Sequence, residues 1–392
     1  MSPPHVETCM KPKESQMAEA ICYACKQSFT FSNVPPGGQV QCPNCGTPNV
    51  LNAPDPPVVR IPQIKRPAER EPGNSAVATV VNRIIGNIET VIVGKHEEIV
   101  LTLMAYVAEG HVLLEDVPGV AKTMLARALS RSIGCAFKRI QCTPDLLPTD
   151  ITGSSVFNPR TTEFEFRPGP LFAQIVLADE INRATPRAQA ALLEAMAERK
   201  VTADGTNYEL TPPFMLIATQ NPIDHEGTFP LPEAQLDRFL VRLSLGYPEF
   251  EFEISMLKRL QLQHPIETLE PVATAEEVLA CQEAVRQVHV DDKVSRYIVQ
   301  LIQATREHYD LTLGASPRAS IALFRCAQAF VAIHNFDFVM PDDVKQVAPH
   351  VLGHRLILRP ESRLRKKTVA GVLKEILDTV PVPQVPAGGA AR

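Results

Sequence analysis

The chain has 392 residues, of which 45% are hydrophobic and 21% are charged, and its formal net charge is -5. This length predicts two or three folding units, and the small acidic charge argues against nucleic acid or an anionic membrane as the main partner. No run approaches the roughly 18 apolar residues of a membrane helix. Residues 1–20 lack the apolar core of a signal peptide, so we expect a cytoplasmic protein without membrane insertion.

Four of the nine cysteines lie close together near the N-terminus. They form two Cys-x-x-Cys pairs separated by sixteen residues: Cys22, Cys25, Cys42 and Cys45. This spacing is typical of a structural zinc site, and so short a segment needs a metal to fold because it cannot bury enough core. We therefore predict a zinc ribbon over residues 18–50, similar to small bacterial zinc ribbons, with disulfides or free thiols as the alternative.

The predicted ribbon has almost no charge. Between Ala18 and Val50 the only charged side chains are Glu19 and Lys26. Binding to phosphates normally depends on several cations, so a protein-contact role is favoured over nucleic acid. Residues 51–74, with six prolines, predict an extended linker, and residues 381–392 predict a disordered tail.

The remaining chain divides into an α/β part and a helical part. Over residues 75–247 short apolar runs alternate with helical patterns, which predicts a parallel sheet between helices. The runs at 112–114, 175–178 and 214–218 are continuously apolar, as in strands buried on both faces. Residues 248–380 show a helical pattern throughout. One helical face is formed by Val294, Tyr297, Ile298, Leu301 and Ile302.

Residues 112–123, VLLEDVPGVAKT, have the layout of a Walker A loop. An apolar strand leads into a tight turn, and Lys122-Thr123 open a helix whose N-terminus would cradle phosphates. Lys122 would neutralise the phosphates of ATP, and the Thr123 hydroxyl would hold Mg²⁺. The general pattern has glycine where Asp116 and Ala121 stand, so an ordinary strand-turn-helix remains an alternative. The predicted nucleotide-binding residues are Asp116, Val117, Pro118, Gly119, Val120, Ala121, Lys122 and Thr123.

Two further strands end in polar residues suited to hydrolysis. Residues 175–180, IVLADE, place Asp179 and Glu180 at a buried strand end, where paired carboxylates are unfavourable without a cation or a catalytic role. Asp179 would position Mg²⁺ and Glu180 would polarise the attacking water. Residues 214–221 end in Asn221, which could orient that water. The alternatives are two solvated acids and an ordinary turn residue.

The succession VPGVAKT, LADEINRA, ATQNP, LPEAQLDRF and GASPRA resembles the MoxR family of AAA+ ATPases over residues 75–375. Members of that family tolerate Asp at the position of Asp116 and a small residue at that of Ala121. The resemblance implies that Asn221 is the sensor 1 residue, Arg238 an arginine finger donated to a neighbouring subunit, and Arg318 the sensor 2 arginine of a helical lid.

The same resemblance implies how such a protein works. It implies a homo-oligomeric ring, usually a hexamer, with chaperone-like activity that remodels or matures protein clients. A partner with a von Willebrand factor A domain often accompanies the family. The competing hypothesis is a nucleic-acid motor or transcription-associated ATPase that binds DNA through its zinc ribbon, which the charge disfavours. A nucleotide-binding scaffold without turnover is disfavoured by Glu180.

The residues themselves support these two roles less strongly than the resemblance does. Arg238 has a simpler interpretation, whereas the position of Arg318 agrees with a phosphate-binding role. Arg238 follows Asp237 and could form an ordinary ion pair with it. Arg318 follows Ser316-Pro317, a helix start, where a cation is unfavourable unless an anion such as a phosphate lies nearby.

Residues 154–168 and 200–211 read as β-hairpins. The resemblance places such hairpins near the pore of the ring, and ordinary decoration is the alternative.

Overall fold

The computed structural model describes residues 5–6, 17–21, 28–32, 39–41, 43–44, 48–51, 75–222, 227–260 and 264–383. The chain forms two compact units, Met1–Ile61 and Pro62–Arg392. Each unit is described by itself below. None of the helices in these ranges is both long and apolar enough to cross a membrane.

The first unit contains short strands. β2 (Met17–Ile21) pairs antiparallel with β3 (Ser28–Ser32). A second sheet has the order β1 (His5–Val6), β5 (Pro48–Leu51) and β4 (Gln39–Gln41). The four cysteines predicted to bind zinc, Cys22, Cys25, Cys42 and Cys45, lie outside the described residues, as do residues 52–74 of the predicted linker and 384–392 of the predicted tail.

The second unit is built on a five-stranded sheet in which every neighbouring pair is parallel. The three central strands are the three continuously apolar runs, so the prediction of a buried parallel sheet is confirmed. The strand that borders β6 at one edge was not predicted, because Arg242 interrupts its apolar run. In sheet order the strands are β14 (Val241–Leu243), β6 (Val112–Glu115), β13 (Met215–Gln220), β10 (Ile175–Asp179) and β7 (Phe137–Gln141).

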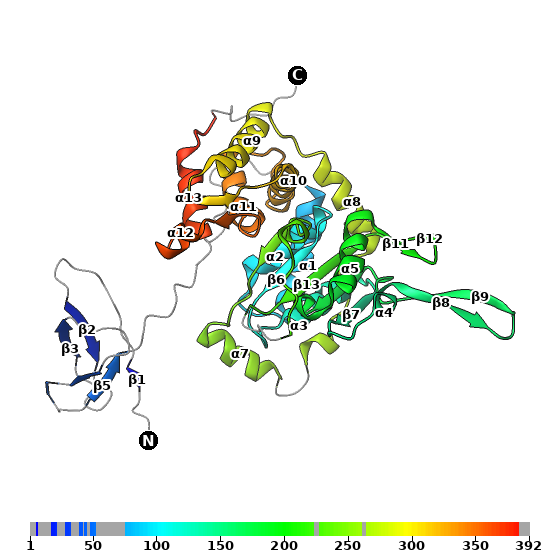
Figure 1. Cartoon of the computed structure of the whole chain (residues 1–392), viewed down its shortest axis with the longest axis horizontal. Coiled ribbons are helices and arrows are strands. Elements are labelled where there is room, and N and C mark those ends of the chain that lie inside the picture. Colours follow the sequence, from blue (N-terminus) through cyan, green and yellow to red (C-terminus); the bar gives the residue numbers. More distant parts are fainter. Residues whose placement is uncertain are drawn as a thin grey trace. The chain divides into compact units, whose positions relative to one another are not determined.

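Helices cover both faces of this sheet (Figure 1). Alternate strand residues point to opposite faces, and they join two different hydrophobic clusters. Leu114 and Leu177 pack with α1, α2 and α3, whereas Leu113 and Val176 pack with α5. This two-sided burial explains why the runs are continuously apolar. The helices of the α/β part are α1 (Ala76–Glu89), α2 (His96–Val107), α3 (Lys122–Ile133), α4 (Pro148–Thr152), α5 (Pro186–Glu198) and α6 (Glu233–Leu236).

Both predicted hairpins are present. β8 (Gly153–Asn158) pairs antiparallel with β9 (Glu163–Pro168), and β11 (Lys200–Ala203) pairs with β12 (Thr206–Glu209). The first hairpin projects away from the sheet (Figure 1), and Phe164 near its end is 74% exposed. Phe166 at its base stacks on Tyr208 of the second hairpin, with ring centroids 4.0 Å apart. The two hairpins therefore brace each other.

The C-terminal part forms a helical lid that shares one hydrophobic cluster with α1, α2 and α3. Its helices are α7 (Phe250–Leu260), α8 (Ala275–Arg286), α9 (Asp292–Glu307), α10 (Pro317–Ile333), α11 (Pro341–Leu352), α12 (Pro360–Leu364) and α13 (Val369–Thr379). The expectation of a purely helical region is wrong in one detail. β15 (Leu311–Leu313) pairs antiparallel with β16 (Ile357–Leu358), because these short connections bury Leu311 and Leu358 and satisfy their backbone groups by pairing.

Candidate functional site

The loop between β6 and α3, residues 116–121, is called the phosphate loop below. It leaves an open space at the start of α3. Gly119 and Ala121 have left-handed backbone, with φ of 86° and 61°. A side chain built on Gly119 would meet nothing within 4 Å, so the space beside the loop is open. Ala121 occupies the N-cap of α3 and provides no side-chain acceptor for the first N–H groups. Free N–H groups and the helix dipole together favour an anion at this point.

Lys122 lies at the first position of α3, with Thr123 next to it, and both are half-buried. The Lys122 ammonium donates to the carbonyl oxygen of Asp116 at 2.7 Å. Burial lowers the pKa of Lys122, while nearby carboxylates act in the opposite direction. These carboxylates are Asp116, Asp179 and Glu180, so the acidic pair predicted from the sequence is near enough to Lys122 to act on its charge.

Asp116 has a structural task that accounts for a carboxylate where the general pattern has glycine. One carboxylate oxygen accepts from the Val117 N–H at 2.9 Å. The other accepts from the Gly246 N–H at 2.6 Å and from the Ser244 hydroxyl at 3.1 Å. Asp116 therefore ties the start of the loop to the segment that follows β14.

Asp179 and Glu180 end β10 beside this loop, and both are held by neighbouring strands. One Asp179 oxygen accepts from Arg139 Nε at 3.0 Å and from its terminal nitrogen at 2.6 Å. The other accepts from the Thr219 hydroxyl at 2.6 Å. That hydroxyl in turn accepts from the Glu180 N–H at 2.8 Å. Thr219 thus links the two acids.

The Glu180 side chain is turned toward β7. Its carboxylate accepts from Gln141 Nε2 at 3.3 Å and from Arg183 at 3.1 Å. Glu180 has left-handed backbone, with φ of 58°, which is unusual outside glycine. Arg139, Gln141 and Thr219 were not predicted as site residues. Gln141 ends β7, Arg139 lies in the middle of β7, and Thr219 is the last residue but one of β13. The rule that singled out Asn221 could have found Thr219, because both belong to the carboxyl end of the same apolar strand.

Asn221 follows directly on β13 and is buried. In the sheet β13 lies between β6 and β10, so Asn221 follows the strand that separates the Walker A strand from the acidic pair. Its carbonyl oxygen accepts from the Asn182 side chain at 3.5 Å. The sequence prediction that Asn221 lies at the carboxyl edge beside the phosphate loop agrees with this order.

Arg238 lies on the other side of the sheet from α3. Its guanidinium donates to the carbonyl oxygen of Leu193 in α5 at 2.5 Å, and α5 packs on the face opposite to α3. Asp237 pairs with Arg355 at 2.8 Å instead of with Arg238. The ion pair with Asp237 that was considered for Arg238 is therefore formed by Arg355.

Arg318 is the second residue of α10, and its side chain is 55% exposed. Its guanidinium is 4.0 Å from an Asp237 oxygen. Ser316 occupies the N-cap position, as predicted, but its hydroxyl makes no capping hydrogen bond. It donates to Asp237 at 2.8 Å.

A small apolar pocket of about 60 Å³ adjoins the phosphate loop. Ala121 and Met124 form one wall, and Ile92, Met256 and Pro265 contribute to the others. The sequence prediction missed this pocket, although the apolar run Val91–Val93 before Gly94 was a usable signal.

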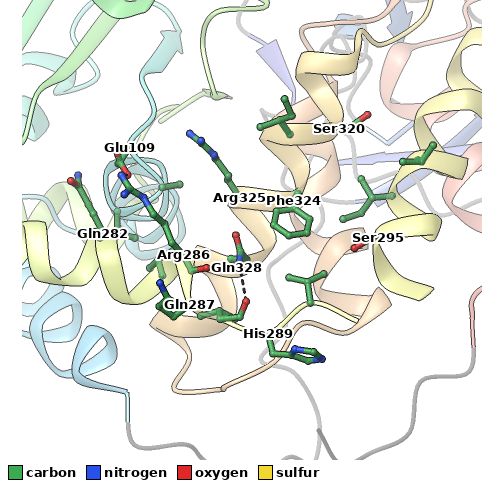
Figure 2. Close-up of a pocket in the computed structure, with 18 residues that line it drawn as sticks. Glu109, Gln282, Arg286, Gln287, His289, Ser295, Ser320, Phe324, Arg325 and Gln328 are labelled. Atoms are coloured by element: carbon green, nitrogen blue, oxygen red, sulfur yellow. Dashed lines mark hydrogen bonds and ion pairs between the residues drawn. The ribbon is translucent and has the colours of Figure 1, made fainter. Parts of the chain in front are cut away.

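A larger cavity, of about 680 Å³, lies away from the phosphate loop, among the end of α2, α8, α9 and α10. Figure 2 shows Phe324 and Gln328 in its middle, with Arg286 on one side and Ser295 on the other. None of the predicted site residues lines it. The segment after α2 leads into the start of β6, whereas the phosphate loop follows the end of β6. This cavity, called the groove below, therefore lies at the amino ends of the strands, opposite the phosphate loop.

Three potential metal ligands gather in the lid: His308, Asp310 and Glu375 have ligand atoms within 4.8 Å of one another. A lysine already supplies the positive charge there. Lys367 Nζ is 2.5 Å from Glu375 and 3.7 Å from Asp310. We therefore interpret this group as a structural ion pair network.

Comparison with known proteins gives consistent matches to both parts of the second unit. Residues 111–241 match the ATPase family associated with various cellular activities (AAA), and residues 303–376 match the AAA lid domain. A solved structure of a putative ATPase from Cytophaga hutchinsonii aligns with a TM-score of 0.74 and 36% identity, covering 79% of this chain and 96% of that one.

The alignments with three curated relatives each cover most of the relative's length. The chain is 52% identical to the uncharacterized protein YeaC of Bacillus subtilis, over 78% of this chain and 95% of the relative. It is 39% identical to chaperone MoxR1 of Mycobacterium tuberculosis, over 80% of this chain and 85% of the relative. It is 30% identical to protein MoxR of Methylorubrum extorquens, over 74% of this chain and 92% of the relative.

Proposed function

The chain belongs to the MoxR family of AAA+ ATPases, and we propose that it uses ATP hydrolysis to remodel or mature protein clients. Hydrolysis of ATP to ADP and phosphate is the activity of the family. The observation that carries the proposal is the open loop before α3 with Lys122 beside the carboxylates of Asp179 and Glu180. The name of the Mycobacterium tuberculosis relative, a chaperone, supports the part that concerns protein clients.

In this proposal residues 116–123 hold the phosphates of ATP. The residues fit this ligand, because the N-terminus of α3 is uncapped by any side chain and the space beside Gly119 is open. Lys122 would exchange its contact with the Asp116 carbonyl for a phosphate oxygen. Thr123 and Asp179 would hold Mg²⁺, which neutralises phosphate charge in such sites. One Asp179 oxygen already accepts two hydrogen bonds from Arg139, whereas the other accepts one, from Thr219, and retains a lone pair for this purpose.

Glu180 is the residue we assign to the attacking water. Its carboxylate is part-exposed, and among the residues that the structure describes it is held by two side chains, Gln141 and Arg183, both on the same oxygen. The other oxygen keeps its lone pairs. A carboxylate placed in this way can orient water and draw on its proton. Asn221 would orient the same water from the end of β13.

We assign Arg238 to the active site of a neighbouring copy in a homo-oligomeric ring, most simply a hexamer. Its contact with α5, on the face opposite to α3, supports action on another subunit rather than on its own phosphate loop. Arg318, exposed at the start of the lid helix α10, is assigned to the γ-phosphate of its own subunit. A ring would thus join each phosphate loop to the arginine of the next copy.

The N-terminal segment is assigned to contacts with other proteins. We propose that Cys22, Cys25, Cys42 and Cys45 bind one structural Zn²⁺ in a ribbon over residues 18–50, which its lack of charge suits to a protein partner. A partner with a von Willebrand factor A domain, and a cytoplasmic location, belong to the same proposal.

Zinc content gives a direct prediction for this segment. The full chain should carry one zinc per subunit, measured by elemental analysis after gel filtration, and Cys42→Ser should lose it. The ATPase rate of the variant should stay close to that of the wild type, because the phosphate loop belongs to the other unit. Full-length protein that is folded, active and free of zinc would contradict the assignment.

The function itself is tested by trapping clients. Glu180→Gln should bind ATP without turning it over, so proteins held by the ring should stay bound while ATP is present. The comparison is with Lys122→Ala, which should bind ATP more weakly, at an ATP concentration that fills the wild-type site but not the site of this variant. Proteins enriched with Glu180→Gln alone, and released when ATP is removed, support the proposal. Enrichment of nuclease-sensitive nucleic acid instead, with DNA-stimulated hydrolysis at physiological salt, would favour the DNA-linked alternative.

A further inference from the structure

The carboxylate of Asp237 joins the lid to the segment that carries Arg238. Asp237 follows α6 and directly precedes Arg238. One of its oxygens accepts from Arg355 Nε and the other from the Ser316 hydroxyl, each at 2.8 Å. Both partners belong to the lid, since Ser316 precedes α10 and Arg355 follows α11. The Asp237 side chain is 17% exposed, so these contacts are largely shielded from water.

Arg355 binds the backbone of the same segment as well as the carboxylate. Its side chain is 2% exposed. Its terminal nitrogens donate to the carbonyl oxygens of Phe239 at 2.7 Å and Leu240 at 3.2 Å. The terminal nitrogen that donates to Phe239 also donates to the carbonyl oxygen of Asp237, at 3.3 Å. The planar guanidinium of one lid residue therefore fixes residues on both sides of Arg238.

The third lid residue near Asp237 is held more loosely. Arg318 is 4.0 Å from the Asp237 oxygen and more than half exposed, so this ion pair is weak. Arg318 can move to a phosphate while Asp237 keeps Arg355 and Ser316. The Asp237 carboxylate thus has two firm partners and one exchangeable partner, all three from the lid.

We propose that Asp237 is a positioning residue for ATP hydrolysis, through which the lid of one subunit sets the placement of the Arg238 that this subunit offers to its neighbour. The inference rests on the proposed function, in which Arg318 meets the nucleotide of its own subunit and Arg238 that of the next. A shift of the lid on nucleotide binding moves Arg355 and Ser316. Because these side chains hold Asp237 and the carbonyls around Arg238, that segment moves with them.

Asp237→Asn tests the carboxylate with little change in shape. We expect nucleotide affinity within about twofold of wild type, because the phosphate loop is untouched. We expect kcat to fall by about 10- to 100-fold with little change in KM, as when a catalytic group is displaced by about an ångström. Asp237→Glu, which keeps the charge, should recover part of this loss.

Asp310→Asn is the matched control. Asp310 is a buried lid carboxylate that accepts from a serine hydroxyl, Ser362, at 2.6 Å and lies 3.7 Å from a cation, Lys367. It contacts neither Arg238 nor the segment around it. We expect a comparable fall in unfolding temperature for both variants, but a kcat for Asp310→Asn within about twofold of wild type. An equal fall in kcat for both variants would overturn the proposal, since general weakening of the lid would then explain it.

Mixed rings provide a readout that a purely structural role would not move. Asp237→Asn subunits have an intact phosphate loop, and Lys122→Ala subunits have a correctly placed Arg238. Mixing them should raise ATPase activity well above the sum of the separate rates, as mixing Arg238→Ala with Lys122→Ala should. A gain with Arg238→Ala and none with Asp237→Asn would overturn the proposal. No gain in either mixture would remove the trans role of Arg238, and this inference with it, while the ATPase activity of the wild type would stand.

Ser316→Ala keeps the test valid if Asp237→Asn does not fold. This variant removes one lid partner of Asp237 and leaves the ion pair with Arg355. We expect a fall in kcat of about two- to fivefold that mixing with Lys122→Ala relieves. A wild-type kcat in Ser316→Ala, together with an unfolded Asp237→Asn, would assign the whole contact to stability.

Discussion

Two glutamates with left-handed backbone stand at opposite edges of the same sheet, Glu109 before β6 and Glu180 after β10. Glu109 is closely paired, with Arg199 at 2.6 Å and with Arg286, and its side chain is 8% exposed. Its pKa is lowered in spite of burial, by hydrogen bonds from these two arginines. Glu180 has one arginine and one amide and is 27% exposed.

The difference teaches what marks a reactive site in this protein. Unusual backbone occurs at both edges, and the larger cavity is at the edge of Glu109. What is specific to the edge of Glu180 is a carboxylate with spare lone pairs close to an ammonium group and an open helix N-terminus. Availability of charge, rather than cavity size or backbone strain, distinguishes the proposed nucleotide site from the groove.

The largest expected effect separates the two glutamates. Glu180→Gln should retain ATP binding and lose turnover by about 10³-fold, because the amide cannot draw on the proton of water. Glu109→Gln should leave kcat within about twofold and lower the free energy of unfolding by about 1–3 kcal/mol, since Arg199 and Arg286 lose their charged partner. Steady-state ATPase rates and chemical denaturation measure the two quantities. Wild-type turnover in Glu180→Gln would show that the reactive acid lies elsewhere.

Lys122→Ala sharpens the comparison by separating binding from chemistry. Removing the ammonium should weaken ATP affinity by about 10- to 100-fold, because a charge-assisted contact to phosphate is worth about 1.5–3 kcal/mol. Fluorescent nucleotide titration of the full chain measures this change, with Glu180→Gln as the comparison that should bind like the wild type. Equal affinity in both variants would argue against phosphate contact by Lys122.

The strands that position the proposed nucleotide site could be predicted from the sequence, and the reasons are local. The central strands β6, β10 and β13 are apolar on both faces, and each ends in or just before its polar residue. Gln141 and Arg139 escaped because β7 is an edge strand with mixed burial, in which polar side chains are ordinary and do not stand out as site residues. Asp237 and Arg355 escaped because they are 118 residues apart in sequence, and nothing in either segment indicates the other.

A pH experiment probes buried histidines outside the proposed nucleotide site. His111, next to the start of β6, accepts the Leu216 N–H at one ring nitrogen and contacts the Met196 carbonyl with the other, and burial lowers its pKa to about 4. Burial likewise lowers the pKa of His350 in α11 to about 4.

Both histidines are therefore neutral in the folded protein at pH values where the unfolded chain already binds protons. Their contribution to stability is fully present above about pH 6.5 and is lost as the pH falls toward 4, by about 1.4 kcal/mol per pH unit for each group. Denaturation measured from pH 7.5 to 5 should show this loss, reduced in His111→Gln. A flat profile would mean that these rings are protonated when folded.

The smallest expected effect concerns the groove itself. Ile321→Ser and Arg325→Ala alter exposed side chains that line it. We expect kcat and KM of both variants within about twofold of wild type, as for surface substitutions remote from a site. A change of tenfold or more in either constant would break the contrast between the two edges and tie the groove to nucleotide turnover.

The backbone of Glu180 also sets a conflict between stability and activity. A side chain in the left-handed region costs about 1–2 kcal/mol relative to ordinary backbone, a cost that glycine largely avoids. Random mutagenesis selected only for resistance to heat should therefore accept glycine at position 180 and yield a sturdier protein without turnover. Selection for ATPase activity should reject the same change. Selection for stability and selection for activity should therefore favour different residues at position 180.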